Sequence, residues 1–188
     1  MGALIGGGAI LLIALIAFFW IKGIYNNIIS QDEAVDASWA QVENVLQRRY
    51  DLIPNLVNTV KGFAKQEQGV LTEVTALRSQ WANAGSVADK AEASSGLERA
   101  LGRLMVISEK YPDLKSNVNF LRLQDELAGT ENRVSVERRR YNVAVQAYNT
   151  TIRTFPAVFI ANNMGMEKRD AYFEAETEAT TAPVVDFE

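Results

Sequence analysis

The sequence contains no cysteine and no histidine among its 188 residues. Without cysteine there is no disulfide, no thiolate nucleophile and no cysteine-bound zinc or iron–sulfur cluster. Without histidine there is no histidine general base, no Ser-His-Asp triad and no His-ligated metal, which also excludes the di-iron helical bundles. Only carboxylate, hydroxyl, lysine or tyrosine chemistry remains, and these residues form no catalytic constellation in the sequence. We therefore predict a non-enzymatic protein that binds no metal and no other cofactor.

Proline is also scarce, with four in the chain, and strand-like alternation of apolar and polar residues is absent. The hydrophobic content of 48% combines an uninterrupted apolar segment at the start of the chain with long amphipathic stretches after it. The first 21 residues carry no charge, and 17 of them are apolar. At about 1.5 Å per residue this run spans about 30 Å, the thickness of a bilayer hydrocarbon core.

The apolar run lacks the basic start and the A-x-A-like cleavage site of a signal peptide. We expect an uncleaved transmembrane anchor over residues 1–24, with Trp20 and Lys22 at its interfacial end. Lys22 is the one basic residue near the span, which favours an external N-terminus and a cytoplasmic body. Gly2 and Gly6 form a G-x-x-x-G pair, which either packs against a neighbouring subunit or reflects the frequency of small residues in such helices.

Beyond the anchor, apolar residues recur alternately four and three positions apart from Val35 to Trp81. This spacing predicts one long coiled-coil-like helix that continues the anchor, is kinked near Pro54 and ends near Ala82. Further apolar faces predict a second helix over residues 88–110 and a third over 114–154.

Three prolines divide the helical body, at Pro54, Pro112 and Pro156. We expect Pro112 to end the second helix, Asp113 to cap the third, and Pro156 to end it. The predicted fold is all-α: an N-terminal transmembrane helix followed by an up-and-down antiparallel bundle. Either Pro112 only kinks the chain, giving one long return arm, or it reverses the chain, giving three or four shorter crossings.

The end of the chain differs from the bundle in composition. The apolar run 157–161 is too short to span a bilayer. We expect it to form a packed bundle end, a re-entrant or interfacial contact, or a subunit contact. Residues 174–188 hold five acidic residues and no basic one, and we expect them to be disordered. The predicted domains are the anchor at 1–24, the bundle at 25–173 and the acidic tail at 174–188.

Several motifs in this order resemble the LemA family of bacterial membrane-anchored helical proteins. They are RYDLIPNLV at 49–57, EKYPDLK at 109–115, ENRVSVERRRYN at 131–142 and RTFP at 153–156. The resemblance implies a single transmembrane helix in the bacterial inner membrane, a short external N-terminus and an antiparallel bundle. It also implies roles in membrane organisation, membrane remodelling or envelope signalling, and it supplies no catalytic residue.

Four charged residues interrupt the apolar stripes, at Arg49, Glu67, Glu131 and Arg138. A charge in a helical core must be paired, or it costs several kcal/mol. One interpretation is a proton- or ligand-responsive cluster. The simpler interpretation, which we favour, is a polar network of ion pairs that fixes the register of the helices.

The run Arg138–Arg140 does not form one basic patch, because three consecutive helical residues spread over about 200°. With a net charge of −4 we expect no nucleic-acid binding. If the third helix returns to the membrane, Arg139, Arg140 and Arg153 are candidates for contact with lipid phosphates.

Taken together, these features predict a membrane protein that contacts lipid and self-associates into a scaffold or ring. Trp81, Phe159 and Phe173 are candidate subunit contacts, because the loops and ends of bundles rarely need large aromatic residues. The alternative is a membrane-anchored sensor or adaptor, in which the four core charges line a ligand pocket and the tail recruits a protein partner.

Overall fold

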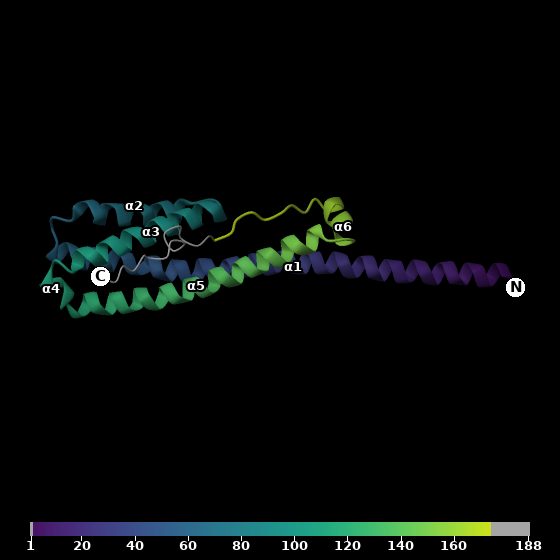
Figure 1. Ribbon diagram of the computed structural model, residues 1–188, viewed down its shortest axis with the longest axis horizontal. Helices are drawn as coiled ribbons and strands as arrows, with labels where there is room; N and C mark the ends of the chain where they lie inside the picture. Colours follow the sequence, from purple (N-terminus) through teal and green to yellow (C-terminus); the bar gives the residue numbers. More distant parts are fainter. Residues whose placement is uncertain (1, 174–188) are drawn as a thin grey trace, which may run out of the picture. The chain divides into compact units, whose positions relative to one another are not determined.

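The anchor and the stripe that follows it form a single helix. The computed structural model describes residues 2–173, with side chains described from residue 7, and the acidic segment 174–188 lies outside the described residues. Helix α1 runs Gly2–Phe63 and passes through Pro54 without interruption (Figure 1). The expected continuation of the anchor into the body is therefore confirmed. Among the described helices, α1 is the one long and apolar enough to cross a membrane.

The chain divides into two compact units. Unit 1 contains residues 2–43 and 140–170, and unit 2 contains residues 44–139 and 171–173. Helices α1 and α5 (Val118–Arg153) each contribute to both units. Each unit has its own apolar core.

The prediction that one helix extends from Val35 to Trp81 is wrong. Helix α1 ends at Phe63, a turn follows, and α2 begins anew at Gln68–Asn83. The amide of Glu67 donates to the Ala64 carbonyl across this turn, at 3.2 Å. The apolar spacing continues through the turn because both helices bury their stripes in the core of unit 2, so the spacing alone does not reveal where the helix breaks.

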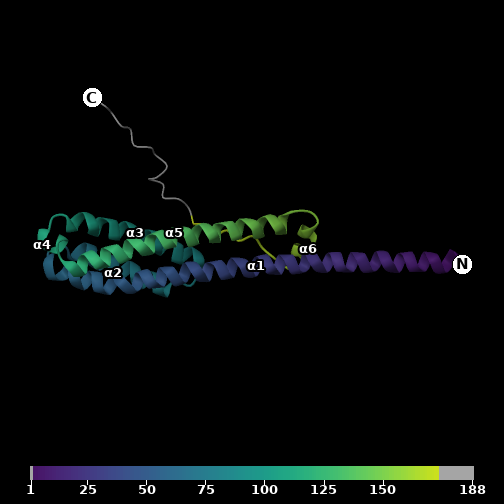
Figure 2. The same ribbon diagram turned by 90° about the horizontal axis from the view of Figure 1, so that it is seen from below.

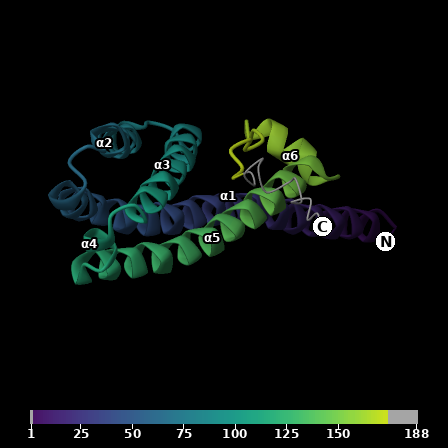
Figure 3. The same cartoon turned by 60° about the vertical axis from the view of Figure 1, so that its left-hand side comes forward.

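The second predicted helix is confirmed as α3, Val87–Ser108. The Ser86 hydroxyl caps it by accepting from the Asp89 amide at 3.1 Å. Helices α2 and α3 lie side by side (Figure 3). A Cβ at Gly96 would lie 3.0 Å from a methyl group of Leu77, so glycine is what permits this close approach.

Pro112 reverses the chain instead of merely kinking it. It is the first residue of a single helical turn, α4 (Pro112–Lys115), and α3 and α5 run in opposite directions on either side of this turn (Figures 1 and 2). The third helix therefore starts at Val118, not at Leu114. Its cap is Asn117, not Asp113, because the Asn117 carboxamide oxygen accepts from the amides of Asn119 and Phe120.

Unit 2 is an up-and-down bundle of four helical segments, which confirms the all-α antiparallel prediction. The end of α1, then α2, α3 and the first part of α5 succeed one another in alternating directions (Figure 1). Its buried side chains include Leu46, Ile53, Leu56, Val60, Leu71, Val74, Leu97, Leu101, Leu104, Leu114, Phe120, Leu127 and Val134.

Unit 1 pairs the first part of α1 with the last part of α5 in antiparallel orientation (Figure 2). Trp39 and Tyr141 fix the register, because their ring centroids are 5.5 Å apart. After Pro156 ends α5 as expected, the short helix α6 (Ala157–Asn163) turns back beside it. The buried side chains of this unit are Ile28, Val35, Val42, Tyr141, Val145, Tyr148, Ile152, Ala157 and Ala161, with Asn149 among them.

Replacing Asn117 with alanine removes the oxygen that caps α5. The free energy of unfolding should fall by about 1 kcal/mol, because two amides at the helix start lose their acceptor. Urea denaturation followed by far-ultraviolet circular dichroism measures this change. The matched control is Asn119→Ala, an exposed position two residues on, which should change stability by less than about 0.5 kcal/mol. Equal effects of the two substitutions would contradict the assigned cap.

Candidate functional site

Arg49 is the most deeply buried charge among the described residues, with 6% of its surface exposed. It lies on α1 in unit 2 and forms an ion pair with the carboxylate of Glu131 on α5. Burial lowers the pKa of the Arg49 guanidinium, the nearby Glu98 charge opposes that shift, and Arg138 adds to it. The fold therefore shelters this cation and supplies anions to balance it.

Arg138 is the second sheltered cation of unit 2. Its Nη2 donates to Oε1 of Glu98 at 2.6 Å and to the Ser94 hydroxyl at 2.7 Å, both on α3. The guanidinium also lies over the ring of Phe173, with its central carbon 4.8 Å from the ring centroid. Arg138 thus ties α5 to α3, whereas Arg49 ties α5 to α1. Together the two ion pairs join three helices.

Tyr50, which follows Arg49 in the chain and lies close to Glu98 and Arg138, belongs to an aromatic pair. The rings of Tyr50 and Trp81 pack edge to face with centroids 4.3 Å apart, and the Lys90 ammonium lies 5.4 Å from the Trp81 ring. Arg78 donates to the Tyr50 carbonyl at 3.1 Å. Burial raises the pKa of the Tyr50 hydroxyl to about 12, so this phenol stays protonated at neutral pH and is not prepared to act as a base.

Glu67, the fourth charge predicted to belong to the core network, lies apart from the other three. It precedes α2, and its carboxylate accepts from the Tyr111 hydroxyl at 3.2 Å. The contact joins the turn after α1 to the turn before α4. Glu98 and Ser94 occupy the place in the network that sequence analysis had given to Glu67.

The arrangement in unit 2 is suited to holding helices together. Each of the two arginines has a carboxylate partner, so the cluster carries no excess charge for a ligand to neutralise. Within residues 2–173, no group of three or more acidic side chains is arranged to hold a metal ion. These side chains form ion pairs that connect helices.

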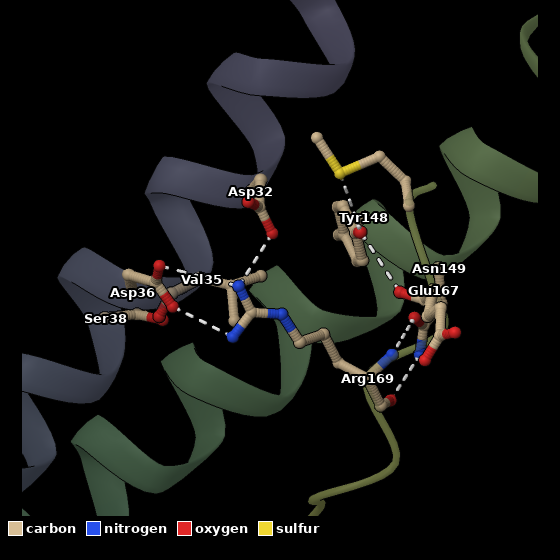
Figure 4. A network of polar contacts seen from close by, with 9 residues as sticks. Asp32, Val35, Asp36, Ser38, Tyr148, Asn149, Glu167 and Arg169 are labelled. Carbon is tan, nitrogen blue, oxygen red and sulfur yellow. Dashed lines mark hydrogen bonds and ion pairs between the residues drawn. The ribbon is translucent and has the colours of Figure 1, made fainter. Parts of the chain in front are cut away.

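A second polar network occupies unit 1 and is centred on Arg169 (Figure 4). Its Nη2 donates to Asp32 at 2.8 Å and its Nη1 to Asp36 at 3.0 Å, two carboxylates one turn apart on α1. Burial opposes the charge of Arg169, but its bonds to Asp32 and then Asp36 outweigh that effect and raise its pKa. We call the segment 166–169 and its partners the Arg169 clasp.

The other side of the Arg169 clasp is held by α5. The Asn149 side chain forms two bonds to the backbone of Arg169, accepting from its amide at 2.9 Å and donating to its carbonyl at 2.8 Å. The Tyr148 hydroxyl donates to the Glu167 carbonyl at 3.1 Å. A segment without regular secondary structure is therefore fastened to two helices at once (Figure 4).

The Arg169 clasp was not predicted from the sequence. Asp32 and Asp36 have helical spacing on one face of α1, but that spacing is also typical of a solvated surface. Arg169 lies in a segment without periodicity and is separated from Asp32 by 137 positions. The available signal was the polar Asn149 on an otherwise apolar face of α5.

The remaining predicted residues fall in several environments. Trp20 and Lys22 are exposed on α1, and Gly2 and Gly6 lie in its first turns, where no side-chain surroundings are described. Phe159 is exposed on α6, whereas Phe173 is half-buried against Arg138.

Trp81, a candidate subunit contact, is 4% exposed and packs against Tyr50 inside unit 2. Its ring therefore fills the core of its own chain and is not presented at the surface of the unit.

The Glu98→Gln substitution tests the sheltered ion pair. It leaves Arg138 without its anion at a site where both side chains are less than a fifth exposed, so the free energy of unfolding should fall by about 3 kcal/mol. Glu73→Gln is the matched control, because Glu73 pairs with Arg103 in solvent and its loss should cost less than about 1 kcal/mol. Replacing both Glu98 and Arg138 with leucine should recover most of the loss. Similar losses in E98Q and E73Q, measured by urea denaturation, would show that the pair is not sheltered.

The Asn149→Leu substitution tests the Arg169 clasp. It removes both bonds to the Arg169 backbone, so amides 166–170 should exchange with deuterium about tenfold faster. Hydrogen exchange read by mass spectrometry measures this rate. Gln146→Leu makes the same apolar change at an exposed position of α5 and should leave the rate unchanged. Unaltered exchange in N149L would mean that other contacts hold the segment.

Comparison with known proteins finds relatives of this chain. The chain is 28% identical to the magnetosome protein MamQ of Magnetospirillum gryphiswaldense, over 94% of this chain and 74% of that one. It is 27% identical to magnetosome protein MamQ 1 of Paramagnetospirillum magneticum, over 86% and 68% respectively, and 24% identical to protein LemA of Metamycoplasma hominis, over 91% and 76%. The LemA family model matches residues 38–187. The chain therefore belongs to the LemA family, as its motifs suggested.

Proposed function

We propose that this chain is a non-enzymatic, single-pass membrane protein whose helical body self-associates into a membrane-bound scaffold. The observation that carries this proposal is an exposed seam on α5, formed by Gly129, Val136 and Val143 at seven-residue spacing.

The anchor is supported by the exposure of α1. Every described side chain from residue 7 to residue 21 is exposed, although the segment is entirely apolar apart from its glycines. Such a surface is stable in lipid and unstable in water. With Lys22 directly after the span, the proposed orientation is an external N-terminus and a cytoplasmic body at the bacterial inner membrane.

The seam on α5 consists of exposed residues that do not contribute to the core of either unit. Val136 and Val143 are 44% and 60% exposed. Gly129 costs about 1 kcal/mol relative to alanine inside a helix, yet an added Cβ would meet no described atom within 4 Å. A glycine followed by β-branched residues at heptad spacing suits the close approach of a second helix.

The polar core favours a structural role over catalysis. Its arginines are bound to Glu131, Glu98 and Ser94, and its tyrosine is held protonated by burial. Similarity to proteins named for the magnetosome agrees with work in organising a membrane. A scaffold needs rigid bodies of this kind, because assembly at a membrane depends on surfaces held in fixed positions.

The double substitution Val136→Glu with Val143→Glu tests the seam. It introduces two charges at the proposed contact and should weaken self-association by more than about tenfold. Sedimentation or light scattering of the full chain in mild detergent at micromolar concentration measures the assembly. The control is Val106→Glu, at a valine on α3 that is more exposed than either seam valine, which should leave assembly unchanged.

Two results would overturn the proposal. A strictly monomeric unaltered chain under these conditions would exclude the scaffold. Unchanged assembly in the double variant would exclude the α5 seam as the contact surface.

A further inference from the structure

A pair of exposed aromatic rings marks the corner between α5 and α6. Phe155 and Phe159 are 80% and 67% exposed, and their ring centroids are 6.0 Å apart. The opposite face of α6 is buried through Ala157 and Ala161. The short helix therefore packs with its small residues and presents Phe159 outward, next to the exposed Phe155 that precedes it. Two exposed rings of this size are unfavourable in water.

The register of unit 1 gives the level of this corner along α1. Tyr141 contacts Trp39, and the two helices run antiparallel, so each step forward on α5 corresponds to one step back on α1. The Arg169 clasp gives an independent check, because Arg169 binds Asn149 and Asp32 together, close to the level that this register predicts. Phe155 lies fourteen positions after Tyr141, and is therefore level with Tyr25.

Tyr25 lies just beyond the apolar span. It is three positions after Lys22, which corresponds to about 4.5 Å along the helix axis. The polar interfacial layer on each side of the hydrocarbon core is about 5–7 Å thick. The corner is thus at the depth of the lipid headgroups if α1 spans the bilayer as proposed above.

Neighbouring side chains have the character of an interface. Trp20 and Tyr25 are exposed on α1 at 57% and 46%, as in the aromatic belts of membrane proteins. Arg153, the last residue of α5, is exposed beside the corner and can reach lipid phosphates. Arg139 and Arg140 lie about 20 Å from Arg153 along α5 and are not at this depth. Of the three arginines that the sequence offered as candidates for contact with lipid phosphates, only Arg153 is therefore placed at this level.

We propose that Phe155 and Phe159 insert into the headgroup–acyl boundary of the bilayer and form a second membrane contact. The anchor fixes the chain at one point, and this corner then holds unit 1 against the lipid surface. The contact is continuous with the lipid-exposed surface of α1, which is why lipid is the occupant. The inference depends on the anchoring of α1 but not on self-association.

The absence of cysteine allows a direct test, since a single introduced cysteine is labelled uniquely. The full chain is placed in phosphatidylcholine–phosphatidylglycerol vesicles, with an environment-sensitive fluorophore at Phe155→Cys or Phe159→Cys. Val106→Cys on α3 is the exposed control, and Ile13→Cys reports on the anchor. Lipids carrying a nitroxide near the headgroup should quench the labels at 155 and 159 at least about twofold more than the label at 106.

The controls separate failure of this inference from failure of the anchor. Quenching at 13 by nitroxides deep in the acyl chains, with labels at 155 and 159 no more quenched than at 106, would overturn the second contact alone. Absence of quenching at 13 would overturn both. Self-quenching between labels at 159 that disappears on dilution with unlabelled chain, without lipid quenching, would identify a second copy as the occupant and also overturn the inference.

Discussion

Seven-residue apolar spacing along α1 determines what each unit must contain. Ile28, Val35 and Val42 are buried in unit 1, and Leu46, Ile53 and Val60 continue the stripe in unit 2. A stripe of this kind cannot remain in water, so α5 must cover it in unit 1 and three further helical segments must share it in unit 2. From residue 7 to residue 21 the helix is apolar and its described side chains are exposed, a surface suited to lipid instead of to protein.

Polar residues inside the cores hold specific elements at specific places. Arg49 and Arg138 connect α5 to α1 and to α3, and the Arg169 clasp fastens an irregular segment to α1 and α5. Each of these contacts joins residues far apart in the sequence. The apolar surfaces supply the drive to associate, whereas these bonds select one arrangement among several of similar apolar burial.

Periodicity predicted the helices well and the turns poorly. The limits of α3 follow from its apolar face and its flanking loop, and the end of α5 follows from Pro156. The break at residues 64–67 was missed because the stripe keeps its phase across it. Glu67 was assigned to the core network because it occupies a stripe position, whereas the true partner, Glu98, lies on α3 where nothing local distinguishes it from a solvated residue.

The pairing of Arg49 with Glu131 shows what a charge contributes inside an apolar core. Trp39 lies ten positions before Arg49 on α1, and Tyr141, which it contacts, lies ten positions after Glu131 on α5. Each unit by itself therefore shows the same pairing register of α1 with α5. Valines and leucines at heptad spacing would tolerate a slip of seven residues. Such a slip would bring either Gln124 or Arg138 opposite Arg49, leaving a buried cation unpaired or beside a like charge at a cost of several kcal/mol. The buried ion pair therefore excludes registers that apolar packing alone would allow.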